Sequence, residues 1–506
     1  MGSSCFVWIR SGLFVATMAV WMGRCFSGTL VAMSSGILRQ DAFLGADRVV
    51  YLDAAATSLM PKVVFDAQRD YFQLSCANPH SETHLGSRST TLAIEDARES
   101  IASLFGADRS YATIFVGAGS TAALNRAARV VSSLAAERPR VIVSALEHHS
   151  NLLPWWDRSG LEVVLVSPLA DGSHDYAAIE YALQQAPTAA VAASAASNVT
   201  GAVADLPLLG AIARRYGAMT VIDAAQAAPH LAIDVSSSGI DFLAISGHKL
   251  FVPGSPGVLI ARRSLMERSL FGDVGGGTVD RVYPDGRVDY SSCVEAREEA
   301  GTPNVPGVLG LGIIAKVLLR EGMSALRAHD IELTSRLLAG LRAREWIVVY
   351  GSDAPGGIPR VGTVAFNLKD VPHGLVGAAL SDLFKVWVRT HCFCAHPYVQ
   401  LLLERSEPIA TAMLPEGMAR QGMVRASFGP WNTTEDIEIL LRSLDQIQAT
   451  GIAGLGYTPR LDARSSRHPR PVEATARRAL LLSGRAGTSL RAMTTTPVAN
   501  AYRGLR

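Results

Sequence analysis

Short runs of consecutive apolar residues alternate with segments of helical periodicity between residues 113 and 260. Segments such as 206–216 repeat apolar residues every three or four positions and predict helices. Strands that alternate with helices in this way form a mostly parallel sheet covered on both faces. We therefore expect an α/β fold, with the clearest strands at 141–144, 192–196, 219–223 and 242–246.

Polar residues stand at or just beyond the carboxyl ends of these expected strands. In open α/β sheets, ligands bind outside the carboxyl ends, where side chains from neighbouring strands converge. The sequence therefore predicts one ligand site lined by Ser120, His148, Asn198, Asp223 and Ser246.

The stretch 240–260 contains the most informative strand end. After the strand, the chain passes through Ser246, His248 and Lys249 into a turn rich in proline and glycine, and a second apolar strand follows. A lysine at a strand end is ordinarily a solvated surface residue. Asp223 ends another apolar strand 26 residues upstream, so a carboxylate and an amine are expected at the same edge of the sheet.

A glycine-rich turn follows the expected strand near 113–116 and opens a helix. Ser120 and Thr121 fall at the helix start, where unpaired N–H groups and the positive end of the helix dipole favour a phosphate. These residues could also serve only as N-terminal caps.

Composition places the chain among globular proteins of two domains plus tails, since it has 506 residues, 48% of them hydrophobic and 18% charged. From about residue 320 onward, helices and short strands indicate a smaller α+β domain. We predict an N-terminal extension at 1–40, a large domain at 41–310 whose first segment packs on the small domain, the small domain at 311–450, and a basic disordered tail at 451–506.

The termini carry the positive charge of the chain. Residues 1–40 and 458–506 together hold a charge of +11 against a total of +2, so the remainder is acidic and no nucleic-acid partner is expected. The apolar run at 12–23 is shorter than the about 20 residues that span a bilayer, so no membrane partner is expected either. It reads as a targeting segment or as an unused start upstream of Met33.

Six cysteines without a spaced framework argue for a reducing compartment and against structural disulfides. We expect a cytoplasmic protein, or a mitochondrial one if the N-terminal segment is a transit peptide.

Together, the Asp223 strand end and the Ser246-Gly247-His248-Lys249 strand end resemble the pyridoxal-phosphate enzymes of aminotransferase class V. The resemblance covers about residues 40–450 and includes the segments 49–61, 147–156 and 424–433. It implies the fold type I of pyridoxal-phosphate-dependent transferases, in which the large domain binds the cofactor.

The resemblance also implies the roles of individual residues. In the family, the lysine matched by Lys249 carries pyridoxal 5'-phosphate as a Schiff base, and the aspartate matched by Asp223 pairs with the pyridinium nitrogen. His148 would stack on the ring and Gln226 would hydrogen-bond its O3'. Thr278 would reach the cofactor phosphate of the partner in a homodimer. The remaining implied cofactor contacts are Ser120, Thr121, Asn198, Ser246 and His248.

The segment 388–397 resembles the cysteine desulfurases and selenocysteine lyases within the family, with Cys394 five residues after Arg389. It implies that the Cys394 thiolate attacks the sulfur of L-cysteine, which leaves a persulfide for an acceptor protein and releases L-alanine. Lys249 would move the α-proton. Arg425 would bind the substrate carboxylate as a two-pronged pair, with Asn198 and Arg389 as further substrate contacts.

Departures from the family pattern leave alternatives open. His391 stands where the family has glycine, Ala54 where it has asparagine, and Ala122 where it has glutamate. About 16 additional residues also separate Cys394 from Arg425. Another class V reaction, such as transamination or epimerisation, therefore stays open, as does a silent scaffold that binds a sulfur carrier.

Cys392 has no counterpart in the usual desulfurases, and Cys-Phe-Cys resembles the molybdenum cofactor sulfurases, a further alternative. Two cysteines and two histidines at 391–396 could also suggest zinc. We expect no metal ion, because so tight a cluster cannot easily place four ligands tetrahedrally. His80 and His84 match a loop of the family and are not expected to bind metal either.

Overall fold

The structure is a computed structural model of the 506-residue chain. It describes residues 39–81, 83–158, 160–269, 272–351, 359–369, 371–406, 422–455, 460–461 and 469–470. The predicted extension at 1–40 and tail at 451–506 lie almost entirely outside these residues. A search of the described part finds no helix with the length and apolarity needed to cross a membrane.

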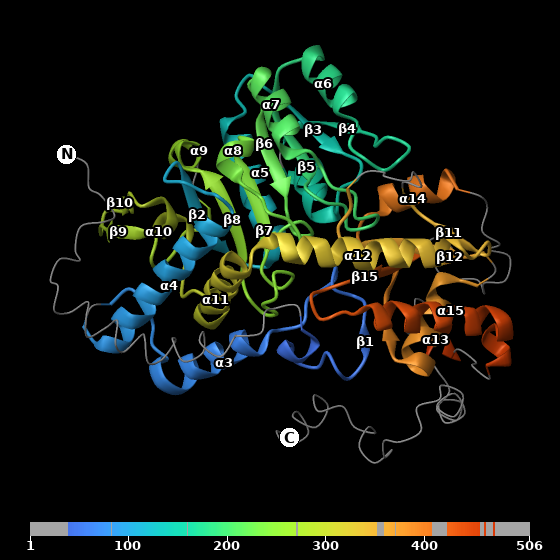
Figure 1. Ribbon diagram of the computed structural model, residues 1–506. Coiled ribbons are helices and arrows are strands. Elements are labelled where there is room, and N and C mark those ends of the chain that lie inside the picture. The colour runs from blue at the N-terminus through green and yellow to red at the C-terminus, as the bar shows by residue number, and fades with distance from the viewer. Residues whose placement is uncertain are drawn as a thin grey trace.

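In the described residues, seven strands form the large sheet (Figure 1). Neighbouring strands pair in parallel from β7 to β4, whereas β8 is antiparallel to both of its neighbours. The prediction of a mostly parallel sheet is confirmed. The order across the sheet is β2 (Tyr111–Val116), β8 (Gly257–Arg262), β7 (Phe242–Ser246), β6 (Met219–Asp223), β5 (Thr188–Ser194), β3 (Arg140–Ser144) and β4 (Glu162–Val166).

Helices cover both faces of this sheet because successive strand residues point to opposite faces. On β6, Val221 packs with the apolar side of α5 (Gly119–Leu134), whereas Ile222 packs with α4 (Leu85–Leu104), α7 (Leu206–Arg215) and α11 (Val305–Glu321). The other helical elements of this part are η2 (Gln40–Ala42), α3 (Lys62–Asp70), η3 (Tyr71–Ser75), η4 (His149–Asn151), η5 (Pro154–Arg158), α6 (Tyr176–Gln185), α8 (Val235–Ser238), α9 (Arg263–Arg268) and α10 (Val294–Glu298).

A smaller antiparallel sheet lies at the other end of the molecule (Figure 1). Its described strands are β11 (Ile347–Val349), β12 (Thr363–Leu368), β15 (Met423–Ser427) and β14 (Arg389–His391), in that order. The helices α12 (Met323–Arg342), α13 (His373–Phe384), α14 (His396–Glu404) and α15 (Thr434–Gly454) belong to this part. The short pair β16 (Arg460–Leu461) and β17 (Pro469–Arg470) follows.

The start of the described chain crosses from one part to the other. The strand β1 (Val50–Tyr51) pairs in parallel with β13 (Val386–Trp387) of the small domain. Ser58 then donates its backbone N–H to the carbonyl of His248, at 3.0 Å. The expected boundary at residue 310 falls inside α11, whose buried residues pack into the large-sheet core. We therefore propose Gly322, between α11 and α12, as the division.

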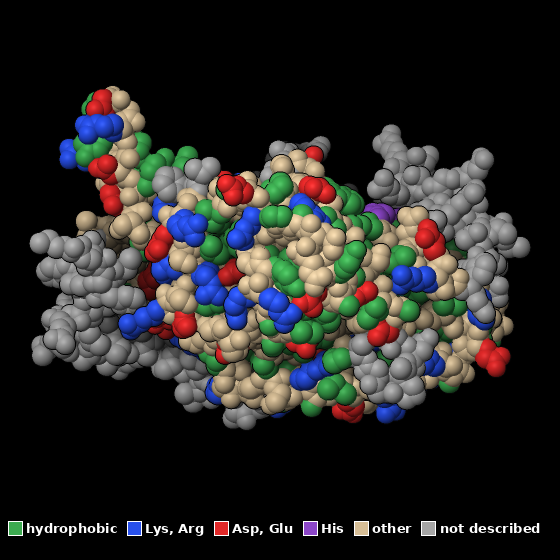
Figure 2. Space-filling model, turned by 90° about the horizontal axis from the view of Figure 1, so that it is seen from above, with side chains coloured by type: hydrophobic (Ala, Val, Ile, Leu, Met, Phe, Trp, Pro, Cys, Tyr) green, Lys and Arg blue, Asp and Glu red, His purple; other side chains and the backbone are tan. Residues whose placement is uncertain are grey.

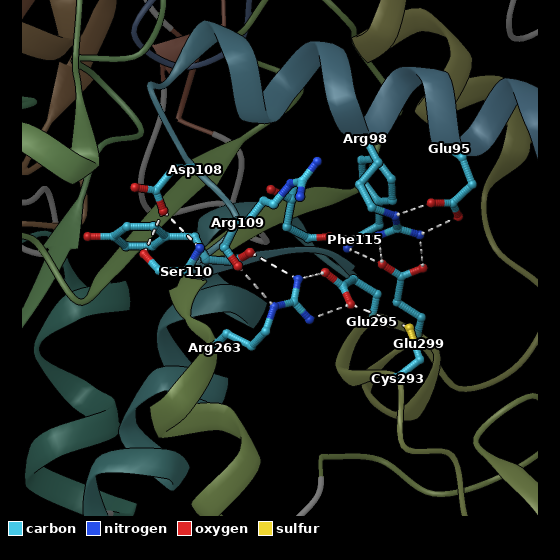
Figure 3. A network of polar contacts seen from close by, with 12 residues as sticks. Glu95, Arg98, Asp108, Arg109, Ser110, Phe115, Arg263, Cys293, Glu295 and Glu299 are labelled. Atoms are coloured by element: carbon cyan, nitrogen blue, oxygen red, sulfur yellow. Dashed lines mark hydrogen bonds and ion pairs between the residues drawn. The ribbon is translucent and has the colours of Figure 1, made fainter. Parts of the chain in front are cut away.

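A partly buried ion pair fixes the segment that precedes α11 (Figure 3). Arg98 of α4 donates to both carboxylate oxygens of Glu299, at 2.6 and 3.1 Å. Glu299 also accepts the backbone N–H of Phe115 in β2 at 2.7 Å, and the Arg98 guanidinium lies 5.0 Å from the centre of the Phe115 ring. One carboxylate thus joins a helix, a strand and the chain after α10.

A narrow hairpin of β9 (Val279–Val282) and β10 (Val288–Tyr290) leaves the body on the side away from the small domain (Figure 1). Figure 2 shows a projection on that side that carries both basic and acidic side chains.

Candidate active site

Ser120 and Ser246 meet at the carboxyl edge of the large sheet, as predicted. The backbone N–H of Ser120 donates to Ser246 Oγ at 2.8 Å, and Ser246 Oγ donates to Ser120 Oγ at 3.0 Å. This approach needs glycine at 119, where φ is +57° and a Cβ would lie 2.9 Å from Ser246 Oγ. It also needs glycine at 257, where a Cβ would lie 2.1 Å from the Gly119 carbonyl oxygen. The hydroxyls and N–H groups gathered at the start of α5 form a place for an anion.

Thr121 and His148 are connected through Ser150, a residue that sequence reasoning did not single out. Thr121 Oγ1 lies 2.7 Å from Ser150 Oγ, which lies 3.0 Å from His148 Nδ1. His148 Nδ1 also accepts the backbone N–H of Ser150 at 3.1 Å. Burial, with the charge of Lys249, lowers the pKa of His148 to about 3. The imidazole is therefore neutral at ordinary pH, as a stacking ring should be.

Lys249 is half-buried in the turn after β7. Burial lowers the pKa of Lys249 to about 8, although the negative charge of Asp223 opposes the shift. Arg425 lowers this pKa further, and Cys394 raises it. Lys249 and Asp223 stand at the ends of the neighbouring strands β7 and β6, and Asn198, just beyond β5, contacts both Arg425 and the Cys394 loop.

Two carboxyl groups, those of Asp223 and Glu147, are buried in the large domain. Asp223 Oδ1 accepts the backbone N–H of Ala225 at 2.9 Å, and burial raises the pKa of Asp223. The sequence analysis gave no role to Glu147. Its carboxylate accepts hydrogen bonds from Ser194 N at 2.7 Å, Ser194 Oγ at 2.6 Å and Asn151 Nδ2 at 2.6 Å. Burial raises the pKa of Glu147 to about 8. Its position just before His148 was the only signal for it in the sequence.

Gln226 and His248 contact the N-terminal segment that passes from the small domain to the large one. Gln226 Nε2 donates to the Ala55 carbonyl oxygen at 2.9 Å, and His248 Nδ1 lies 3.3 Å from Thr57 Oγ1. Burial, with the charge of Lys249, lowers the pKa of His248 to about 4. Both side chains are therefore neutral hydrogen-bonding groups that contact the same N-terminal segment.

Arg425 of β15 is buried and reaches the site from the small domain. Its Nη1 donates to the Asn198 carbonyl oxygen at 2.9 Å, and its Nη2 donates to Asp53 Oδ1 at 3.3 Å. Burial lowers the pKa of Arg425 to about 10, so it keeps its charge at neutral pH. Arg389 is more exposed, and its Nη1 lies 3.7 Å from Asp53 Oδ2. Sequence reasoning assigned no role to Asp53, although a carboxylate between two arginines could have indicated one.

Cys394 is exposed on the loop between β14 and α14. Two hydrogen bonds from the large domain hold this loop: His149 N donates to the Cys394 carbonyl oxygen at 2.7 Å, and Asn198 Nδ2 donates to the Phe393 carbonyl oxygen at 2.8 Å. Phe393 and Cys394 have φ of 51° and 56°, values that side-chain-bearing residues seldom adopt. The surrounding contacts must therefore hold this loop in shape.

Thr278 is the predicted site residue that lies apart from the others. It is buried in the turn before β9, where its Oγ1 donates to the Gly275 carbonyl oxygen at 2.8 Å. Figure 1 places this hairpin far from the end of β7. Thr278 therefore does not belong to the pocket formed by its own chain.

The described residues fit pyridoxal 5'-phosphate. The start of α5 offers an anion site, and Lys249 offers an amine whose lowered pKa favours the nucleophilic form. Asp223 offers a carboxylate for a protonated ring nitrogen, and such a cation would offset the cost of burying its charge.

Comparisons with known proteins agree with this arrangement. The model of the aminotransferase class-V family matches residues 50–440. A probable cysteine desulfurase of Halalkalibacterium halodurans is 33% identical over 412 residues, which cover 80% of this chain and 95% of the relative. A probable cysteine desulfurase of Aeropyrum pernix is 36% identical over 414 residues, which cover 79% and 95%.

Solved structures give the same result. The cysteine desulfurase CsdA of Escherichia coli, in its S-sulfonic acid form, superposes with a TM-score of 0.70 at 29% identity, covering 81% of this chain and 97% of that one. The apo cysteine desulfurase of Thermococcus onnurineus has a TM-score of 0.71 at 29% identity, covering 81% and 96%. Members of this class are generally dependent on pyridoxal phosphate. The chain belongs to the aminotransferase class-V family, among its cysteine desulfurases.

Proposed function

We propose that this protein converts L-cysteine to L-alanine and retains the sulfur as a persulfide on Cys394. The observation that carries the proposal is the pair of hydrogen bonds that hold the Cys394 loop of the small domain against the large domain, from His149 N to the Cys394 carbonyl oxygen and from Asn198 Nδ2 to the Phe393 carbonyl oxygen. A lysine alone would serve any class V reaction. A thiol on a loop held at this site supplies the nucleophile that sulfur removal needs.

Pyridoxal 5'-phosphate would be held by Lys249, Asp223, His148, Gln226, His248, Ser246, Ser120 and Thr121. When bound, this cofactor supplies an electron sink that makes the α-proton of the amino acid acidic. Lys249 can accept and return that proton, because its pKa of about 8 lies close to neutral pH. Asp223 supports the sink from a buried position.

Arg425 would bind the substrate carboxylate, since its guanidinium is buried and charged and contacts Asn198. Asp53 already occupies part of the fork, so we propose that the substrate carboxylate replaces or shares this contact. Arg389, which is more exposed, would contribute at the rim of the site.

Cys394 would attack the substrate sulfur as the thiolate. The new bond joins the two sulfur atoms, the carbon–sulfur bond of the substrate breaks, and its electron pair takes up a proton at the carbon. L-cysteine and the thiol thus become L-alanine and one persulfide, with no external oxidant. Because Cys394 is exposed, an acceptor protein or a small thiol can reach the persulfide.

The protein would act as a homodimer in which Thr278 completes the phosphate site of the partner. Its distance from the pocket of its own chain supports this role, as does the projecting hairpin that it precedes (Figures 1 and 2). None of the four cysteines in the described residues forms a disulfide in the structure, which supports a reducing compartment such as the cytoplasm.

The proposal is tested by measuring alanine and sulfide from L-cysteine with the wild type, Cys394→Ser and Lys249→Ala. We expect Cys394→Ser to keep the visible absorbance of the bound cofactor and lose alanine production, whereas Lys249→Ala loses both. Cys76→Ser removes another exposed thiol and should leave turnover unchanged. Full alanine production by Cys394→Ser would refute the proposed role of this thiol.

A further inference from the structure

Three side chains around the Cys394 loop form a group that the proposed reaction does not use. His391 ends β14, Cys392 follows it, and His396 begins α14. One ligand-type atom of each, an imidazole nitrogen or the Sγ, lies within 4.8 Å of the corresponding atoms of the other two. We call these residues the His-Cys-His cluster.

His149 adds a fourth donor from the large domain. Its Nε2 lies 3.0 Å from His396 Nδ1, and the two rings are stacked with centres 4.8 Å apart and planes 6° apart. The sequence argument against zinc assumed that all ligands came from 391–396. The structure adds His149 from η4, 247 residues away in sequence, which contacts His396 of the cluster and also accepts the His396 backbone N–H at 3.3 Å.

The spacing suits a tetrahedral ion after a small closure. Zinc binds imidazole nitrogen at about 2.0–2.1 Å and thiolate sulfur at about 2.3 Å, which puts neighbouring ligand atoms about 3.3–3.6 Å apart. His149 Nε2 and His396 Nδ1 already approach that separation. The ligand atoms of His391, Cys392 and His396 lie up to 4.8 Å apart and must come closer to one another by about 1 Å. Rotation of the exposed His396 ring and the half-buried His391 ring can supply such movement.

We propose that the His-Cys-His cluster binds one zinc-type divalent ion, with His149 or a water as the fourth ligand. Imidazole and thiolate are the ligands that such an ion prefers among the side chains here. Binding of the sulfur as a thiolate releases the thiol proton to the solvent.

The position of the ion gives it a regulatory effect on the proposed function. Two ligands precede Cys394 and one follows it, so a bound ion joins both ends of the loop that carries the nucleophile. Such a clamp would hold Cys394 in one position, and we expect turnover to fall while the ion is bound. This effect rests on the proposed function, whereas the binding site itself does not.

The site is tested by titrating the full-length holoenzyme with Co²⁺, which gives strong visible bands when a thiolate and imidazoles bind it tetrahedrally. We expect one equivalent to bind, Zn²⁺ to displace it, and one proton to be released. Cys392→Ser and His396→Ala should each weaken binding by more than the about 10- to 100-fold that loss of an outer-shell partner costs. Cys76→Ser is the matched control and should bind as the wild type does.

Cys394→Ser separates this site from the nucleophile. Cobalt binding that survives in Cys394→Ser and is lost in Cys392→Ser supports the proposal, whether or not the enzyme desulfurates cysteine. Binding that is unchanged in both Cys392→Ser and His396→Ala, or that depends on Cys394 alone, overturns it. Bound-cofactor absorbance verifies that each variant is folded, and His391→Gln provides a third ligand variant if Cys392→Ser is not.

Discussion

The pKa of Lys249, lowered to about 8 mainly by burial, predicts how the enzyme without cofactor takes up pyridoxal phosphate. Only the neutral amine can attack the aldehyde, so the uptake rate should follow the neutral fraction of Lys249. At about pH 7.5 that fraction is about 0.24 for a pKa of about 8, against about 0.001 for an ordinary lysine with a pKa of 10.5. The buried site therefore gains about 200-fold in reactive amine.

The shape of the pH profile distinguishes the two cases. For a pKa of about 8, the rate rises about 8-fold between about pH 6.5 and 7.5 but only about 1.3-fold between about pH 8.5 and 9.5. For an unperturbed lysine, the second step would be about 9-fold. Stopped-flow absorbance at each pH measures the rate. Division by the rate of a small-molecule amine with the same aldehyde removes the ionisation of the cofactor itself.

Glu147 is the necessary control, because burial raises its pKa to about 8 as well. Glu147→Gln removes that titration, and we expect the midpoint of uptake to stay near pH 8 in this variant. Asp223→Asn removes the charge that raises the pKa of Lys249, so its midpoint should move to lower pH. A profile that keeps rising tenfold per pH unit up to about pH 9.5 would refute the reasoning.

Three further predictions follow from the packing and the ion pairs. Gly257→Ala places a Cβ 2.1 Å from the Gly119 carbonyl oxygen, so we expect weaker cofactor binding in equilibrium titration and a loss of about 1–3 kcal/mol in urea unfolding, whereas Gly374→Ala, which meets nothing within 4 Å, should have little steric cost. Arg425→Lys loses the two-pronged geometry and should raise KM for cysteine at least about tenfold with bound cofactor unchanged; an unchanged KM would place the carboxylate elsewhere. Glu299→Ala leaves the Phe115 N–H without its acceptor and leaves Arg98 with only Thr113 and Glu95, so urea unfolding should show a loss of about 1–3 kcal/mol, and Arg98→Met combined with Glu299→Leu should cost less than the single change.

The strands of the large sheet can be predicted closely from the pattern of apolar residues. The predicted strand at 242–246 is β7, and the predicted strand at 219–223 is β6, because both are mostly apolar runs that end in a polar residue. The strand ends then place Ser120, Asp223 and Ser246 at one edge, since the parallel strands share a direction. Local periodicity is enough for these conclusions.

Contacts between distant segments could not be predicted in this way. Glu147 and Ser150 are important because of what Ser194 and Thr121 offer them, and those partners are far away in the sequence. The His-Cys-His cluster was likewise judged from its sequence spacing alone. Its fourth donor, His149, became visible only when η4 and α14 were placed side by side.

The separation between Lys249 and Cys394 depends on the contacts between the two domains, which neither sheet determines. Lys249 stands on the rigid large sheet, whereas Cys394 stands on a loop of the small domain. The hydrogen bonds that cross between the domains here include two to the loop carbonyls and one from Arg425 to Asn198. Asn198 takes part in two of them, so its side chain and backbone connect the loop to the substrate-binding arginine. A change at Asn198 should therefore disturb the position of the thiol and that of the arginine together, although Asn198 belongs to neither element.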